Sequence, residues 1–397
     1  MENSMRENSI SENRLGQEKI SKLLKMYAIP SIISILVNAL YNIVDQVFIG
    51  WGVGYLANGA TNVVFPITIV FASFALMFGD GSAAYLSLKL GEGNKEEAAK
   101  GVGNGILMSV VISIIFTAFV LLSLPWLLNV FGCTPNLEQY AKDYGYIIAI
   151  GLPFSMVGTT INSVIRADGS PKYAMVTMLA GAVLNVILDP IFIFGMHMGV
   201  RGAALATVFS QIVSVVVIFS MLKKVLHVEK GEKPLWWPHF CKEHMQQMLH
   251  MGFPLALQSM LFPIANTIVQ AGVNTMGTDQ IAAWGICDKL NMLIWLLSDS
   301  MGPALTTFTA QNLGAKNKER IRKGVFVGTA MSAGAVIMVS IILFVGAAFM
   351  TPWFVSAQDA ATLAPLVGAY ARMMAPFFLF YAITEALSGA CCGTGDT

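Results

Sequence analysis

The chain has 397 residues, of which 55% are hydrophobic and only 12% are charged, about half the charged fraction that is usual in soluble domains. A net charge of +1 gives no reason to expect nucleic acid as a partner. Because a water-soluble fold cannot bury so much apolar surface, the composition predicts a polytopic membrane protein. Alternation of apolar and polar residues with period two is absent, which excludes an outer-membrane barrel and makes the predicted fold all-α.

Ten apolar stretches along the chain are long enough to cross a bilayer as one helix each. They lie at 23–50, 59–88, 101–128, 140–165, 173–196, 202–225, 248–276, 280–310, 324–350 and 361–390. The preceding residues, 1–22, are polar with mixed charge and have no apolar core after a basic start. They are therefore predicted to form a cytoplasmic tail rather than a cleaved signal.

Basic residues predict the orientation of these helices. Of the 24 Lys and Arg residues, 20 lie in the tail or in the connections after even-numbered spans, and the connections 51–58 and 351–358 contain none. Since cytoplasmic connections are enriched in Lys and Arg, the N-terminus is predicted to lie in the cytoplasm.

The chain repeats itself with an offset of 223 residues. LGEGNKEEAAKG at 90–101 matches LGAKNKERIRKG at 313–324, and Pro153–Phe154 matches Pro376–Phe377. One unit holds six helices, an even number, so the two repeats are predicted to be parallel and related by an axis along the membrane normal. The second repeat ends two helices earlier than the first, and we expect the complete protein to have twelve.

The repeat predicts the domain organisation. After the tail come an N-lobe at 23–226 with the first six helices, a cytoplasmic linker at 227–247 and an incomplete C-lobe at 248–397 with the last four.

The first span carries polar side chains in its middle. Asn38, Tyr41, Asn42 and Asp45 share one helical face. An acid at the centre of a membrane helix is disfavoured by about 2.5–3.5 kcal/mol on insertion scales. We therefore expect other helices to supply partners for Asp45.

Spans five and six offer such partners. Asn185 and Asp189 are four residues apart on one face, and Pro190 removes a backbone donor and favours a kink. The small residues at 202–206 allow another helix to approach closely, with Thr207 on the next turn. Two carboxylates, an amide and a hydroxyl form an oxygen set suited to Na⁺ or to a shared proton. The plainer alternative stays open: each acid could hydrogen-bond backbone, and Asn38, Asn42 and Thr207 could be interhelical contacts worth about 0.6 kcal/mol each.

Several motifs together resemble the multidrug and toxic compound extrusion (MATE) family, in its bacterial MepA-like and DinF-like branch. They are DQVFIG at 45–50, IRADGSPKYAM at 165–175, NVILDP at 185–190, GVRGAALAT at 199–207 and the duplicated LG-x-x-N connections. The resemblance implies two six-helix lobes and a cation-coupled antiporter that exports cationic and amphipathic drugs by alternating access. It also implies a monomer in the bacterial inner membrane, with Na⁺ or H⁺ as coupling ion and no other cofactor.

The resemblance assigns the cation site residue by residue to Asp45, Asn185, Asp189 and Thr207. Some family members carry a second acid eight residues after the proline of helix seven, where this chain has Phe262, so a second cation site of that type is not expected. Candidates for a substrate cleft share a polar, sulfur or aromatic side chain inside a span: Tyr41, Asn42, Gln258, Met260, Trp284, Lys289 and Glu385. Lys289 could equally be an anchor that reaches the membrane surface.

Two other function classes fit the sequence less well. A flippase for lipids or lipid-linked saccharides would need several Arg or Lys side chains inside the spans to hold phosphate, and almost none are there. A membrane enzyme would need a nucleophile or metal-ligand constellation, but the five histidines lack HExxH spacing and the five cysteines lack CxxC spacing. Transport is therefore the favoured function.

Overall fold

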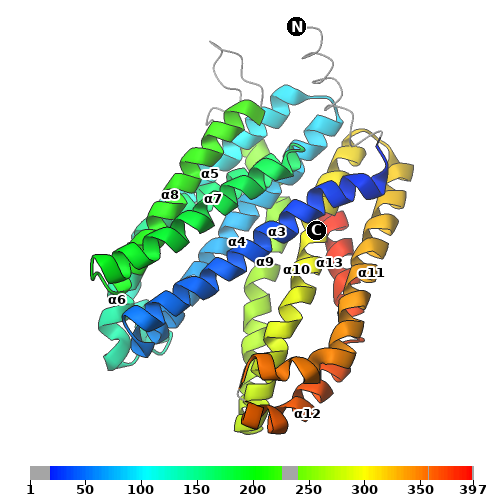
Figure 1. The fold of residues 1–397 in the computed structure, drawn as a ribbon. Helices are drawn as coiled ribbons and strands as arrows, with labels where there is room; N and C mark the ends of the chain where they lie inside the picture. The colour runs from blue at the N-terminus through cyan, green and yellow to red at the C-terminus, as the bar shows by residue number, and fades with distance from the viewer. Residues whose placement is uncertain (1–17, 226–239, 356, 396–397) are drawn as a thin grey trace. The chain divides into compact units, whose positions relative to one another are not determined.

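The computed structural model describes residues 18–225, 240–355 and 357–395, and the regular elements in these ranges are all helical (Figure 1). This confirms the predicted all-α class. Most of the predicted tail 1–22 and of the predicted linker 227–247 lies outside the described residues. The helices are α3 Ile20–Gly52, α4 Tyr55–Gly91, α5 Lys95–Val130, α6 Pro135–Ala167, α7 Pro171–Pro190, α8 Val200–Val225, α9 Lys242–Asn274, α10 Thr278–Gly314, α11 Lys318–Met350, α12 Ala357–Met374 and α13 Phe378–Thr394.

Nine helices within the described ranges are each long and apolar enough to cross a membrane. The tenth predicted span, 361–390, is instead a pair of helices, α12 and α13, bent by 46° at a short break. Pro376 lies in this break, where the missing N–H and the restricted backbone before a proline end a helix. Its repeat partner, Pro153, lies inside the continuous helix α6. A proline at the matching position therefore lies at a helix break in the second repeat but not in the first.

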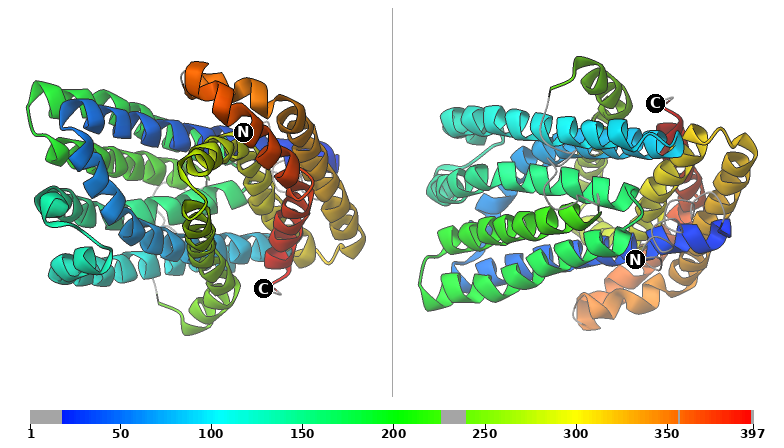
Figure 2. Two further views of the ribbon diagram at one scale, coloured as in Figure 1. Left: turned by 90° about the horizontal axis from the view of Figure 1, so that it is seen from below. Right: turned by 90° about the horizontal axis from the view of Figure 1, so that it is seen from above.

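Residues Ile33–Leu257 form one compact unit, called here the N-terminal unit. Within it α6 packs against α4, α5, α7 and α8, which run side by side in both views of Figure 2. Phe71, Leu124 and Leu152 belong to the larger of its apolar clusters, and Ile161 and Leu222 to a second one.

The described residues up to Ile32, together with those from Gln258 onward, form the other compact unit, called here the C-terminal unit. Here α10 packs against α11, α12 and α13. Leu23 and Leu24, in the first turns of α3, share an apolar cluster with Leu305 and Phe308 of α10. The units therefore divide α3 after Ile32 and α9 after Leu257, whereas the predicted lobe boundaries follow the sequence repeat and remain a prediction.

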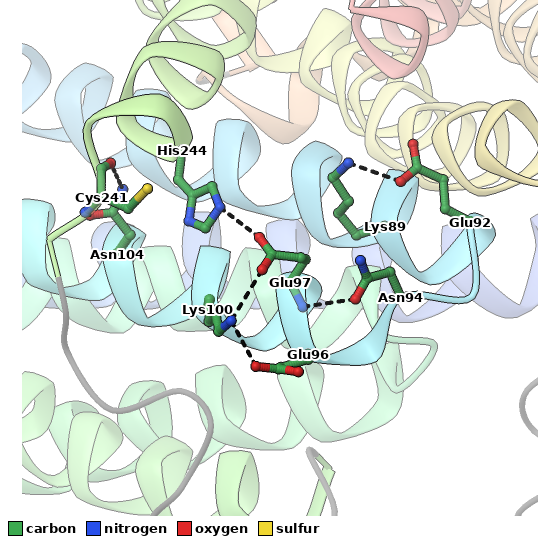
Figure 3. A network of polar contacts seen from close by, with 9 residues as sticks. All are labelled: Lys89, Glu92, Asn94, Glu96, Glu97, Lys100, Asn104, Cys241 and His244. Atoms are coloured by element: carbon green, nitrogen blue, oxygen red, sulfur yellow. Dashed lines mark hydrogen bonds and ion pairs between the residues drawn. The ribbon is translucent and has the colours of Figure 1, made fainter.

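The beginning of α9 is fixed to α4 and α5 by close packing and by polar contacts. A methyl group at Gly252 would clash with the carbonyl oxygen of Met77, so the two backbones touch. His244 Nε2 lies 2.8 Å from Glu97 Oε2. The Asn104 amide donates to the Cys241 carbonyl (3.2 Å) and accepts from the Cys241 N–H (3.3 Å), as Figure 3 shows.

The sequence repeat has a structural counterpart at the starts of α5 and α11. Asn94 Oδ1 accepts a hydrogen bond from the Glu97 N–H (3.2 Å), and Asn317 Oδ1 accepts one from the Arg320 N–H (3.1 Å). Each asparagine thus caps the N-terminus of its helix in the same way. The residue before each cap has a positive φ: Gly93 at 79° and Lys316 at 57°.

This pair of positions provides a matched test of backbone strain. Gly93→Ala is expected to lower the free energy of unfolding by about 1 kcal/mol, because an L-residue is strained in this region and no atom of the described residues lies close enough to contact the new methyl group. Lys316→Gly is expected to raise it by less than about 1 kcal/mol, since the relief of strain is offset partly by a more flexible unfolded chain. The midpoint temperature of thermal unfolding in detergent should fall for Gly93→Ala and rise for Lys316→Gly. Shifts of the same sign would contradict the assignment of backbone strain at these two positions.

Candidate functional site

Asp45 lies in the second half of α3 and faces the other helices of the N-terminal unit. Its side chain is 6% exposed, whereas Leu40 and Ile43 on the same helix are 51% and 54% exposed. The apolar side chains thus face outward, as a lipid-contacting surface requires. The acid is buried by protein, as its cost in a membrane helix led us to expect.

Helix α7 places Asn185 and Asp189 one turn apart on its buried face. Their side chains are 2% and 0% exposed, and Asn185 Nδ2 donates to Asp189 Oδ1 over 3.3 Å. Pro190 ends the helix, and a π-helical turn, Ile191–Gly195, follows directly. The kink predicted at Pro190 therefore takes the form of a π turn, a feature frequently found at functional sites.

Helix α8 adds Thr207. Asn185 Nδ2 also lies 3.4 Å from Thr207 Oγ1, so one amide contacts both Asp189 and the hydroxyl. The close approach predicted from the small residues is present: a Cβ on Gly202 would lie 2.9 Å from the carbonyl carbon of Phe192. Larger residues here would push α8 away from the π turn and would separate Thr207 from Asn185.

The carboxyl groups of Asp45 and Asp189 lie within hydrogen-bonding reach of each other. Among the described residues, three buried oxygens at this point have no hydrogen-bond donor: Asp45 Oδ1, Asn185 Oδ1 and Asp189 Oδ2. Buried oxygens are normally paired, and hard cations bind sets of carboxylate, amide and hydroxyl oxygens. The four residues predicted as a cation site therefore come together with spare acceptor oxygens.

A cavity of about 300 Å³ lies beside these residues, between α3, α4, α6, α7 and α8. Asn185 and Thr207 line it, and so does Tyr41 of α3. Apolar walls are supplied by Leu76 and Phe154, among others. The volume is at the lower end of the range for small-molecule pockets. The oxygen cluster and the cavity thus share two residues.

The structure adds polar lining residues on α8 that the sequence analysis did not select: Ser210, Gln211 and Ser214. They follow Thr207 at helical spacing, three, four and seven residues on, so all four lie on one face. A periodicity test of span six would have found this row. Each residue alone is unremarkable in a membrane helix, which is why it was missed.

The two cleft candidates on α3 are placed differently. Tyr41 lines the cavity, whereas Asn42 is exposed and donates to the Asn38 carbonyl over 2.7 Å. Asn42 lines a separate, open groove together with Gln46. Asn42 shares a helical face with Asp45, but the hydrogen bonds of its amide go to Asn38.

In the C-terminal unit, Gln258 Nε2 donates to Glu385 Oε1 over 3.2 Å, which brings two cleft candidates together. Tyr381, one turn before Glu385, donates to Asp299 Oδ1 over 2.8 Å. Tyr381 was not selected from the sequence, although its spacing of four residues from Glu385 was visible. These side chains form a second polar cluster, in which the acids have Gln258 and Tyr381 as hydrogen-bond donors.

The remaining candidates lie elsewhere in the same unit. Trp284 packs edge-on against Tyr370, with ring centroids 5.9 Å apart, and Lys289 Nζ lies 5.9 Å from the centre of the Phe354 ring. Lys289 is ten residues before Asp299, about 15 Å along α10. Met260 is half-buried on α9.

Comparisons with known proteins agree with this architecture. A family model described as MatE matches residues 30–191 and 254–397, in both repeats. The multidrug export protein MepA of Staphylococcus haemolyticus is 27% identical over 310 residues, covering 77% of this chain and 67% of the relative. A protein of Shewanella oneidensis named FAD transporter is 24% identical over 312 residues, covering 78% and 68%.

Solved structures show the same fold. A crystal structure of a MATE protein in the straight conformation superposes with a TM-score of 0.86 at 22% identity, covering 96% of this chain and 84% of the other. The family match extends over most of the chain and includes Asp45, Asn185 and Asp189. The chain therefore belongs to the MatE family, the multidrug and toxic compound extrusion transporters, and with its MepA relatives it stands among membrane transporters rather than enzymes.

Proposed function

We propose that the chain is an antiporter that exports cationic and amphipathic compounds in exchange for Na⁺ or H⁺, with the cation bound by Asp45, Asn185, Asp189 and Thr207. The observation that carries this proposal is the sharing of Asn185 and Thr207 between the buried oxygen cluster and the adjacent cavity. An ion and a substrate that use the same two side chains influence each other's binding.

The acid pair requires a positive charge. As a general scale, two unit charges of the same sign at a separation of about 4 Å repel by about 4 kcal/mol at an effective dielectric constant of about 20. Asp45 and Asp189 are both buried, so water screens them little. A proton between the carboxyl groups or a Na⁺ ion on the three spare oxygens removes this repulsion. Both ions fit the donor set, which holds only oxygen and amide groups.

Exchange follows from competition for this charge. A cationic substrate in the cavity is attracted by the same carboxylates and is disfavoured once an ion neutralises them. Pro30 inside α3 and Pro190 at the end of α7 are positions where helices bend most readily. Ion binding to Asp45 would then change the conformation of α3 and move the two lobes between inward- and outward-open states.

We further propose a place in the bacterial inner membrane with the N-terminus in the cytoplasm and the protein acting as a monomer. The alternating distribution of basic residues supports this orientation. The substrate class is open to experiment, since one relative is named for multidrug export and another for FAD transport.

Ethidium efflux from proteoliposomes tests the proposal. A Na⁺ gradient at fixed pH and a pH gradient without Na⁺ are applied in separate experiments. We expect one of the two gradients to drive ethidium against its concentration gradient, which also identifies the ion. If neither gradient drives ethidium movement although the protein is folded in the membrane, cation-coupled export is wrong.

A further inference from the structure

The cavity in the N-terminal unit extends well beyond the oxygen cluster. On α7 it is lined from Asn185 back to Thr177, eight residues or about 12 Å along the helix. Arg166, in the last turn of α6, also lines it. The cation site therefore lies near one part of the cavity, while a permanently charged guanidinium lies at another.

Arg166 has hydrogen-bond donors to spare. A guanidinium carries five N–H groups, and here Nη2 donates to Ser163 Oγ over 2.8 Å. Its acidic neighbour is Asp80 of α4, whose Oδ1 lies 3.8 Å from Nη2. Charge-assisted hydrogen bonds are usually 2.7–2.9 Å long, so this ion pair is loose. Nε is buried without a partner among the described residues.

The neighbouring polar residues have their donors occupied. Asn162 Nδ2 donates to the Ala174 carbonyl over 3.0 Å, and Thr177 Oγ1 donates to the same carbonyl over 2.8 Å. Both line the cavity but offer a ligand mainly acceptor atoms. Arg166 is thus the strong donor at this end, and its planar fork matches carboxylate or phosphate oxygens.

We propose that Arg166 binds an acidic group of the substrate, so that the cavity accepts dipolar amphipathic compounds with a cationic part toward the Asp45–Asp189 pair and a carboxylate or phosphate at Arg166. The acidic group would take the place of Asp80, whose contact with Arg166 is loose. This inference rests on the proposed export function and goes beyond it, because it adds an anion-recognising residue to a cavity expected to take cations.

Two dyes that differ in one group test the inference. Rhodamine 110 carries a free carboxylate, and rhodamine 123 is its methyl ester; the ring system is the same. Each is measured for binding to the purified protein and for transport into proteoliposomes. In the wild-type protein we expect both dyes to be transported. Arg166→Gln is expected to weaken rhodamine 110 binding about tenfold, which corresponds to 1.4 kcal/mol, and to leave rhodamine 123 within about twofold.

Two further variants separate recognition from a structural role. Arg166→Lys keeps the charge without the fork and should lie between the wild type and Arg166→Gln for rhodamine 110 only. Asp80→Asn removes the competing carboxylate and should leave rhodamine 110 binding unchanged or stronger. If Arg166→Gln and Asp80→Asn weaken both dyes alike, the pair is structural and the inference is wrong. Transport of rhodamine 123 but not rhodamine 110 by the wild type would overturn the inference alone, and transport of neither dye would overturn the proposed function as well.

Discussion

Replacing Asp45 or Asp189 with asparagine is expected to abolish coupled efflux, lowering ethidium transport about tenfold or more, while the folded protein remains in the membrane. Asparagine has nearly the shape of aspartate and keeps a hydrogen-bonding side chain. In the proposed cation site it removes one of the two carboxylates, so the remaining carboxylate alone binds Na⁺ or a proton without the second oxygen ligand pair and is no longer forced to do so by a neighbouring negative charge. Both side chains are buried in the N-terminal unit, so water does not take over the missing interaction.

Asp143→Asn is the matched control. Asp143 forms an ion pair with Arg201 over 2.8 Å, with side chains 22% and 57% exposed, and exposed pairs contribute at most about 1 kcal/mol to stability. This variant should transport like the wild type. Undiminished coupled efflux in both Asp45→Asn and Asp189→Asn would remove the proposed cation site.

A bulky residue in the cavity should separate substrate transport from ion binding. Ala182 lines the cavity three residues before Asn185 and is 7% exposed. In Ala182→Phe the ring must occupy the cavity or displace its walls, at a cost in stability of about 1–3 kcal/mol. We expect ethidium efflux to fall about tenfold or more, while stabilisation of the purified protein by the coupling ion is retained.

Val183→Phe controls for helix α7 as a whole, because Val183 is the next residue and is 55% exposed on the outer face. It should leave efflux and ion stabilisation unchanged. Full efflux by Ala182→Phe would show that the substrate does not use this cavity. Loss of ion stabilisation in a folded Ala182→Phe protein would instead show that the ring disturbs Asn185.

The oxygen cluster could be predicted from the sequence because its members obey local rules. Asn185 and Asp189 are four residues apart on one helix, which fixes their shared face before any packing is known. Asp45 and Thr207 were assigned to the same cluster because an acid inside a membrane helix needs partners and because of the family resemblance. The structure brings all four side chains together. The helix caps at Asn94 and Asn317 also depend only on residues three positions apart in the sequence.

Features that depend on tertiary packing were not predictable. Pro153 lies inside a continuous helix and Pro376 at a break, although a phenylalanine follows each of them, because surrounding contacts decide whether a proline is tolerated. Likewise nothing local in α3 or α9 shows that the compact units divide both helices. The row at Ser210, Gln211 and Ser214 was visible as a helical pattern, but only the structure shows that these residues line one cavity.

In the proposed mechanism the coupling ion and the substrate compete through Asn185 and Thr207. This competition is tested most directly by measuring ethidium binding to the purified protein. Binding is detected by fluorescence at constant ionic strength, while Na⁺ and pH are varied separately. We predict that Kd rises about tenfold or more with either added Na⁺ or acidification, and that the double variant Asp45→Asn/Asp189→Asn loses this dependence. A wild-type Kd that is insensitive to both Na⁺ and pH would contradict the account.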